Sequence, residues 1–167
     1  YFQIRAIFNR ENLQTIQPKR TVLLLDTSLS MSGDKLPRAV EAVDFFLHNL
    51  NEADEFNLIL FNDETILFRE KPISATVENV ENALRFVRNE TLGGGTNLKK
   101  ALRTAIDQTR FFAGGERNII LISDANPTLE TTKTSEITKI FDNQNAKFFA
   151  FALGTDANET LLKDLSK

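Results

Sequence analysis

Short apolar runs that alternate along the chain with helix-like patterns constrain the fold of this sequence most strongly. Nearly continuous apolar stretches occupy residues 21–26, 56–61, 118–123 and 147–153. Runs of this length without polar alternation are typical of strands in a parallel sheet that helices cover on both faces. Because parallel strands need crossover connections, the helical patterns between the runs predict a doubly wound, Rossmann-like α/β fold with right-handed crossovers.

The segments that follow these runs carry apolar residues at helical spacing, so each expected helix has one apolar face. The first helix follows Asp34, a residue type that commonly caps a helix N-terminus. Most of the 14 phenylalanines are expected in the core, including Phe45, Phe149 and Phe151. The apolar stripes are Leu36, Val40, Val43, Leu47 and Leu50; Val77, Val80, Leu84 and Val87; Leu98, Leu102, Ala105, Ile106 and Phe112; Ile137, Ile140 and Phe141; and Leu161, Leu162 and Leu165.

Two further segments are expected at the edges of the sheet. Residues 2–8 alternate apolar and polar side chains, as a half-exposed edge strand does. Residues 65–68 follow the second apolar run after a three-residue gap that suits a hairpin, which predicts an antiparallel edge strand. We expect one domain over residues 1–167, with a strand order of the 3-2-1-4-5-6 type. Residues 1–19 are expected to form a lead-in strand and linker in a piece of a longer protein.

Composition and charge exclude several classes of function. Apolar residues make up 41% and charged residues 26%, as in soluble globular domains, and no apolar run is long enough for a membrane helix. The net charge of −3 comes from charges of both signs spread along the chain, which argues against nucleic acid as the main partner. Without cysteine, and with His48 as its single histidine, the chain offers no thiolate site and few means of building a zinc site.

Polar residues at the ends of two apolar runs point to a functional site. Asp26, Ser28 and Ser30 stand at the end of the first run, and Asp124 directly follows the third. In the predicted strand order these two runs are neighbours where the chain order reverses. Ligands of open α/β sheets bind beyond the carboxyl ends of the strands at such a point. We therefore expect Asp26 and Asp124 to lie side by side.

A glycine triplet at residues 93–95 precedes Thr96 and leads into the third expected helix. Glycine lets the backbone turn tightly, so the triplet is expected to deliver the Thr96 hydroxyl to the same edge of the sheet. The segment is not a phosphate-binding P-loop, because no Gly-Lys-Ser/Thr follows it. Nor is it a dinucleotide fingerprint, which needs spaced glycines directly after a strand.

The five candidate residues form a set of oxygen donors, three hydroxyls and two carboxylates. Such a set suits a hard cation. Because few carboxylates are present and room for water remains, Mg²⁺ or Mn²⁺ is favoured over Ca²⁺, which stays possible. The candidate metal ligands are Asp26, Ser28, Ser30, Thr96 and Asp124.

The order Asp-x-Ser-x-Ser at residues 26–30, Gly-Gly-Thr-Asn at 94–97 and a lone Asp124 resembles the metal-ion-dependent adhesion site of von Willebrand factor type A domains. Residues 54–61, 126–128, 130–132 and 151–154 resemble the branch found in inter-alpha-trypsin inhibitor heavy chains and bacterial relatives. The resemblance covers roughly residues 20–166. It implies that Ser28 and Ser30 bind the cation directly, and that Thr96, Asp26 and Asp124 bind it directly or through water.

The chain departs from the family pattern at a few positions. Ala125 and Leu29 stand where the family often has glycine, but neither change removes a donor oxygen. The family also usually adds a strand and a helix after the last element expected here, so the domain is expected to be trimmed at this end.

The resemblance implies a non-catalytic protein-binding or adhesion module. An Asp or Glu side chain of a partner protein would complete the coordination of the cation, with no nucleic acid and no direct membrane insertion. The branch favours an extracytoplasmic or cell-surface setting.

Two alternatives remain open at this point. One is a scaffold domain of an intracellular assembly, with the same metal site. The other is a metal-dependent phosphoryl-transfer enzyme with Asp26 as the nucleophile. By resemblance, such enzymes place an acid two positions further on, where this chain has Ser28, so the acid–base partner is missing.

Overall fold

A computed structural model describes residues 17–141 and 144–166 of the chain. The predicted strand at residues 2–8 lies outside the described residues. The strands are β1 (Arg20–Asp26), β2 (Glu55–Phe61), β3 (Thr65–Leu67), β4 (Ile73–Ser74), β5 (Arg117–Ser123) and β6 (Lys147–Ala152). The helices are α1 (Lys35–His48), α2 (Val77–Arg88), α3 (Leu98–Thr109), α4 (Thr134–Thr138) and α5 (Glu159–Leu165), with 3-10 turns η1 (Leu29–Met31) and η2 (Lys139–Phe141).

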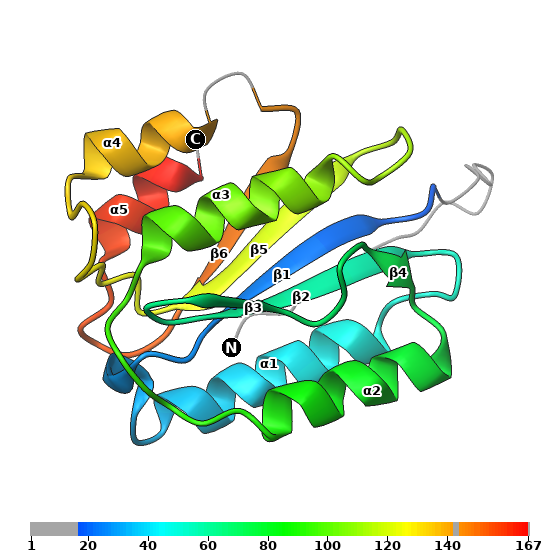
Figure 1. The fold of residues 1–167 in the computed structure, drawn as a ribbon, viewed down its shortest axis with the longest axis horizontal. Coiled ribbons are helices and arrows are strands. Elements are labelled where there is room, and N and C mark those ends of the chain that lie inside the picture. Colours follow the sequence, from blue (N-terminus) through cyan, green and yellow to red (C-terminus); the bar gives the residue numbers. More distant parts are fainter. Residues whose placement is uncertain (1–16, 142–143, 167) are drawn as a thin grey trace, which may run out of the picture.

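The sheet has the strand order β3-β2-β1-β5-β6 (Figure 1). β1 runs parallel to both β2 and β5, and β5 runs parallel to β6. β3 pairs antiparallel with the end of β2, which confirms the predicted hairpin. β4 pairs antiparallel with the start of β2 and was not predicted, because two residues show no recognisable pattern. The predicted order and the antiparallel edge strand are confirmed for the strands that the structure describes.

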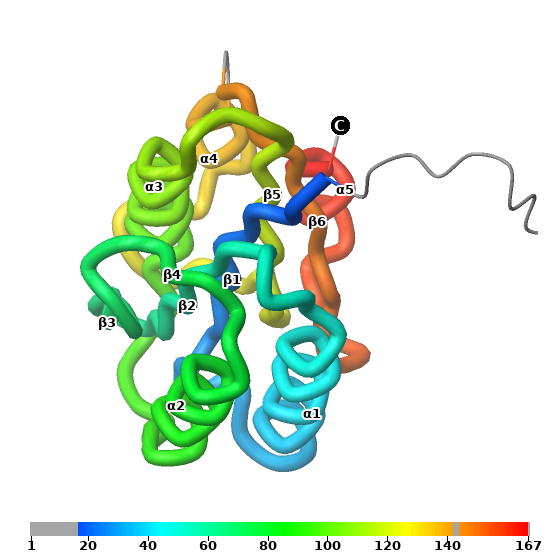
Figure 2. The backbone as a smooth tube through the Cα atoms, turned by 90° about the vertical axis from the view of Figure 1, so that its right-hand side faces the viewer, coloured from blue at the N-terminus to red at the C-terminus, as the bar shows by residue number. Residues whose placement is uncertain are grey.

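Helices cover both faces of the sheet, as the continuous apolar runs predict. Figure 2 shows α1 and α2 on one side of the sheet and α3 on the other, and α4 and α5 contribute to the same core as α3. Along β1, Val22 and Leu24 contribute to the core beneath α3, whereas Leu23 and Leu25 contribute to the core against α1 and α2. Successive side chains of a strand point to opposite faces, so a central strand must be apolar at every position.

β6 differs from its prediction as a strand buried on both faces. Phe148 and Ala150 pack against the core that includes α5. Phe149 and Phe151 point to the other face and are 47% and 54% exposed. β6 is the last strand of the described sheet, so this part of its face stays partly open to solvent. The prediction that Phe149 and Phe151 lie in the core is therefore wrong.

Several details of the helices also differ from their predictions. Asp34 occupies the N-cap position of α1, but its side chain makes no capping hydrogen bond. In α2, Thr76 makes the capping contact by accepting the N–H of Asn79, and Val77 is 74% exposed on the first turn. Phe45 is 73% exposed because each helical residue turns the chain by about 100°, which points Phe45 away from the buried stripe.

Helix ends explain the remaining differences. Leu50 and Phe112 lie beyond the last residues of α1 and α3, although Phe112 is still buried. The predicted fourth helix consists of α4 followed directly by the 3-10 turn η2. None of the helices in the described part of the chain is long and apolar enough to cross a membrane.

His48 at the end of α1 gives a test of local electrostatics. Its ring Nδ1 lies 3.0 Å from the backbone oxygen and 2.7 Å from a carboxylate oxygen of Asp44, and its Nε2 lies 3.7 Å from Glu81. The backbone oxygen and then the carboxylate of Asp44 raise the pKa of His48 above its ordinary value. The contact with Asp44 therefore stabilises the folded protein fully when the pH is below about 6.5, the pKa of His48 in the unfolded chain. This stabilisation is lost as the pH rises through the pKa of His48 in the folded protein.

We expect Asp44→Asn to lower the pKa of His48 towards its ordinary value. NMR titration of the single histidine ring, followed by its chemical shift, measures this pKa. Glu81→Gln is the matched control, and its effect should be smaller because the Glu81 carboxylate lies further from the ring. An unchanged pKa in Asp44→Asn would contradict this assignment.

Candidate functional site

Asp26, the last residue of β1, is held at the carboxyl edge of the sheet by hydrogen bonds from two segments. Its Oδ1 accepts the backbone N–H of Ser28 at 2.9 Å, and its Oδ2 accepts the hydroxyl of Ser123, at the end of β5, at 2.5 Å. The side chain is fully buried. Burial raises the pKa of Asp26, although the hydrogen bonds from Ser123 and Ser28 oppose this shift. None of the groups that bond to Asp26 in the described residues is a cation.

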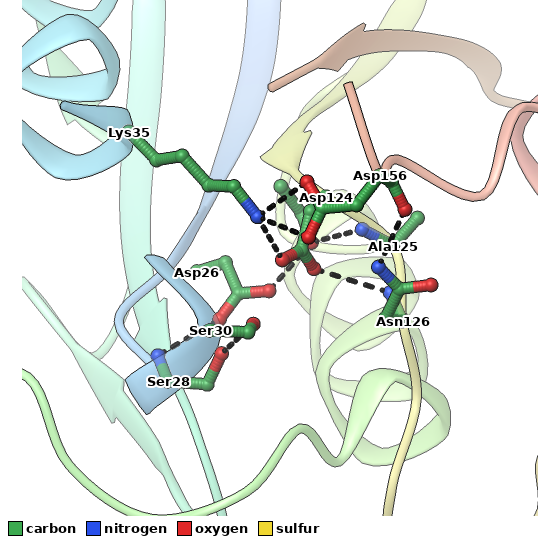
Figure 3. A network of polar contacts seen from close by, with 9 residues as sticks. Asp26, Ser28, Ser30, Lys35, Asp124, Ala125, Asn126 and Asp156 are labelled. Carbon is green, nitrogen blue, oxygen red and sulfur yellow. Dashed lines mark hydrogen bonds and ion pairs between the residues drawn. The ribbon is translucent and has the colours of Figure 1, made fainter. Parts of the chain in front are cut away.

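Two serine hydroxyls follow Asp26 where the chain enters the 3-10 turn η1. The Oγ atoms of Ser28 and Ser30 are 3.0 Å apart (Figure 3). Ser28 is buried, whereas Ser30 is exposed. The alternate spacing of Asp26, Ser28 and Ser30 therefore places a carboxylate and two hydroxyls on one side of the turn, with one hydroxyl open to solvent.

Asp124 follows β5 and is also fully buried. Its Oδ1 accepts the N–H of Asn126 at 3.2 Å, and its Oδ2 accepts the ammonium group of Lys35 at 2.9 Å. Asp26 and Asp124 thus lie at the ends of neighbouring parallel strands, as predicted. Ala125 has a φ of 54°, a left-handed conformation that glycine adopts most easily. This geometry gives a physical reason for the glycine that the family often has at this position.

The glycine segment before α3 is attached to the turn after β1 by backbone hydrogen bonds. Leu29 N–H donates to Gly94 O at 3.2 Å, and Gly93 N–H donates to Thr27 O at 3.0 Å. These bonds bring Thr96, which is buried, to the same edge of the sheet as Asp26. Main-chain contacts therefore attach the glycine segment to the turn after β1, and the placement of the Thr96 hydroxyl at the site stays a prediction.

Two further side chains hold this segment and were missed in the sequence. The carboxylate of Asp63, in the β2–β3 hairpin, accepts the N–H of Gly95. The hydroxyl of Thr128 accepts the N–H of Thr96 at 2.8 Å. Asp63 lies in the three-residue gap of the predicted hairpin, and the sequence gives no sign that this hairpin contacts the glycine segment.

Lys35 and Asp156 also belong to this site and carried no sequence signal. Lys35 is the first residue of α1, and its Nζ lies 2.9 Å from Asp124 and 2.8 Å from Asp156. Burial alone would lower the pKa of Lys35, but hydrogen bonds to Asp156 and Asp124 outweigh it and raise that pKa. Asp156 lies 121 residues away from Lys35, in the loop between β6 and α5. Figure 3 shows the Lys35 ammonium between the two carboxylates.

The donor chemistry of this edge fits a hard cation. Its predicted ligands offer only hydroxyl and carboxylate oxygens, the donors that Mg²⁺ and Mn²⁺ accept. Within the described residues, no group of three or more His, Cys, Asp or Glu side chains is placed to hold a metal ion. Any cation at this edge would therefore depend on the serine and threonine hydroxyls together with the carboxylates of Asp26 and Asp124.

Comparisons with known proteins agree on one family. The model of the von Willebrand factor type A domain matches residues 19–167. Inter-alpha-trypsin inhibitor heavy chain H2 of Homo sapiens is 35% identical over 174 residues, which cover 95% of this chain and 18% of the relative. Heavy chain H4 of Homo sapiens is 34% identical over 155 residues, covering 88% of this chain and 17% of the relative. This chain therefore spans less than a fifth of the length of these relatives.

A solved structure supports the fold independently. The structure of a von Willebrand factor type A protein from Catenulispora acidiphila superposes with a TM-score of 0.81 at 18% identity. The match covers 90% of this chain and 36% of that chain. At this level of identity the likeness shows a shared architecture.

Gly94 tests whether the packing of the glycine segment matters. Gly94 has a φ of +65°, and a Cβ added there would lie 2.6 Å from the Asp63 carboxylate. We expect Gly94→Ala to lower the free energy of unfolding by about 1–2 kcal/mol, because alanine is strained in the left-handed conformation. The free energy of unfolding should fall by about 1 kcal/mol more, because the Asp63 carboxylate must release the N–H of Gly95. Urea unfolding of the purified variant measures the sum of these two losses.

Gly33→Ala is the matched control for this prediction. Gly33 has a φ of +72°, but an added Cβ would meet nothing within 4 Å. This variant should therefore lose only the conformational part of the free energy of unfolding. Equal losses in the two variants would show that Asp63 moves aside without cost.

Proposed function

Because this chain belongs to the von Willebrand factor type A family, we propose that it is a non-catalytic protein-binding module that works through a divalent cation. Mg²⁺ or Mn²⁺ suits the oxygen donors better than Ca²⁺. When bound, the cation supplies an open coordination position that attracts a carboxylate oxygen from an Asp or Glu side chain of a partner protein. The residues proposed to hold it are Asp26, Ser28, Ser30, Thr96 and Asp124.

The observation that carries this proposal is the junction of three segments at the carboxyl edge of the sheet. The turn after β1 bonds to the glycine segment through Leu29 and Gly94, and to the end of β5 through Asp26 and Ser123. Contacts within the chain therefore hold the turn after β1, the glycine segment and the end of β5 together. Binding sites that are organised in advance lose less conformational entropy when the ligand binds.

Asp26 has the role of a positioning carboxylate in this proposal. Both of its oxygens accept hydrogen bonds, so it orients the backbone of Ser28 and the hydroxyl of Ser123. It is buried with only neutral donors as partners, which is costly for an ionised group. A nearby divalent cation would compensate this charge, and the need for such compensation supports the proposed site.

The same contacts argue against the phosphoryl-transfer alternative. The Asp26 carboxylate faces Ser28 and Ser123, and neither residue is a general acid or base. The Lys35 ammonium bonds to Asp124 and Asp156, so it is committed to two carboxylates. This arrangement favours binding over catalysis.

An adhesion module and an intracellular scaffold would use the same cation site. Any further domains of a longer parent protein would distinguish these two functions. An extracytoplasmic or cell-surface setting stays a prediction from the resemblance to the heavy-chain branch.

Calorimetric titration of Mg²⁺ into metal-stripped protein is expected to show saturable binding in the parent. Asp26→Ala and the double change Ser28→Ala/Ser30→Ala should abolish it, because each removes oxygen donors or their support. Asp34→Ala is the matched control, since Asp34 is exposed, lies close by in the sequence and makes no capping bond. A folded parent that binds no Mg²⁺, Mn²⁺ or Ca²⁺ at about 1 mM would rule out the proposed site.

Selection from random peptides displayed on phage tests the chemistry of the partner. Peptides bound to the immobilised domain in Mg²⁺ and released by a chelator are expected to share an Asp or Glu. Replacing that residue by Asn or Gln should remove most of the binding, because a carboxamide has no charge to offer the cation. Selected peptides that still bind after chelation and after this exchange would place partner binding on another surface.

A further inference from the structure

Lys35 occupies a position that the adhesion-site residues alone do not explain. Its ammonium group donates to Asp124 Oδ2 at 2.9 Å, on the carboxylate proposed to hold the cation. The Lys35 side chain is 16% exposed, and the Asp124 side chain is fully buried. An ion pair shielded from water in this way is screened less than one on the surface.

The two buried aspartates of the site are compensated in different ways. Asp26 accepts hydrogen bonds from Ser28 N–H and the Ser123 hydroxyl, which are neutral donors. Asp124 Oδ2 instead accepts a hydrogen bond from the positively charged Lys35 ammonium group. A cation that binds Asp124 must therefore share this carboxylate with the Lys35 ammonium or displace it.

The loop that follows β6 limits the space around the Lys35 side chain. Gly154 has a φ of +90°, and a Cβ added there would overlap Lys35 Cε and Asp156 Oδ1. Asn126 also holds this loop, because its side-chain N–H donates to the backbone oxygen of Asp156 at 3.0 Å. The ammonium is thereby directed into the space between Asp124 and Asp156 (Figure 3).

We propose that Lys35 is the residue that sets the cation affinity of the site, acting as an internal positive charge that competes with the divalent cation for Asp124. Asp156 acts in the opposite direction. It is 62% exposed and binds the same ammonium at 2.8 Å, so it withdraws part of the Lys35 charge from Asp124. This inference rests on the proposed cation site and names the residues that tune it.

Charge counting shows why such tuning matters. Asp26, Asp124 and Asp156 contribute three negative charges and Lys35 one positive charge, which leaves −2. A bound divalent cation brings this group of side chains to zero, so the loaded site does not repel a partner's carboxylate. Without Lys35 the loaded site would keep a charge of −1, bind the cation more tightly and attract an anion less.

A purely structural role for the Lys35 bridge makes a different prediction. If the bridge only ties α1, the end of β5 and the β6–α5 loop together, removal of either partner loosens the site and weakens cation binding. Under competition, loss of Lys35 and loss of the Asp156 charge shift the affinity in opposite directions. The sign of the two effects therefore separates the explanations.

The experiment titrates Mg²⁺ into metal-stripped parent, Lys35→Met, Lys35→Arg and Asp156→Asn by calorimetry, with circular dichroism to check folding. Lys35→Met should bind Mg²⁺ at least about tenfold more tightly, because a unit charge beside the ligand carboxylate is removed. Asp156→Asn should bind Mg²⁺ roughly threefold more weakly, because the Lys35 charge then acts on Asp124 alone. This effect is smaller than that of Lys35→Met, since the partly exposed Asp156 charge is better screened. Lys35→Arg keeps the charge and should stay close to the parent.

Lys147→Met is the matched control, because Lys147 also forms a lysine–carboxylate pair, with Glu116 at 2.7 Å, but lies at the opposite end of β6. It should leave the Mg²⁺ affinity unchanged. If Lys35→Met does not fold, Lys35→Gln removes the same charge and gives the decisive sign, because Asp156→Asn is expected to weaken binding under both explanations.

Each outcome has a defined meaning. Tighter binding in Lys35→Met together with weaker binding in Asp156→Asn supports competition. If the parent binds Mg²⁺ and both changes weaken binding or leave it unaltered, the competition inference fails and the cation site stands. If the folded parent binds no Mg²⁺, Mn²⁺ or Ca²⁺, the cation proposal itself fails and this inference fails with it.

Discussion

The parallel pairing of β1 with both β2 and β5 is the constraint on which the rest of the structure depends. It sets β1 in the middle of the sheet, which requires apolar side chains on both of its faces and helices above and below. It also brings the carboxyl ends of the strands to one edge. Asp26 and Asp124 meet there because the strands that carry them are neighbours, and the hydrogen bond from Ser123 to Asp26 joins the two strand ends directly.

The site at this edge combines buried negative charge with little positive charge to balance it. Asp26 relies on hydroxyl and N–H donors, whereas Asp124 shares the Lys35 ammonium with Asp156. Isolated carboxylates are costly to bury, so such an edge suits a cationic ligand. The family relationship and the oxygen donors together support the proposal of a divalent cation and an acidic partner, and Lys35 is the residue proposed to adjust how tightly that cation is held.

Local pattern was sufficient for much of the fold. The apolar runs and the hairpin at Thr65 follow from features that lie within short windows of sequence, whereas the order of the main strands was expected because it is common among doubly wound sheets. Burial on individual faces was harder to predict, as Phe149 and Phe45 show. Phe149 is half-exposed because β6 is the last strand of the described sheet, and Phe45 is exposed because it lies off the buried stripe of α1.

The sequence by itself determined the α/β class and the separate oxygen-donor motifs that contain Asp26, Ser28, Ser30, Thr96 and Asp124. These features depend on periodicity and on motifs whose residues are close together. Only the tertiary structure decided that Asp63 and Thr128 hold the glycine segment and that Lys35 links Asp124 to Asp156. Such contacts join residues far apart in the chain. Their geometry depends on how helices and loops pack around the sheet, and no local pattern records that packing.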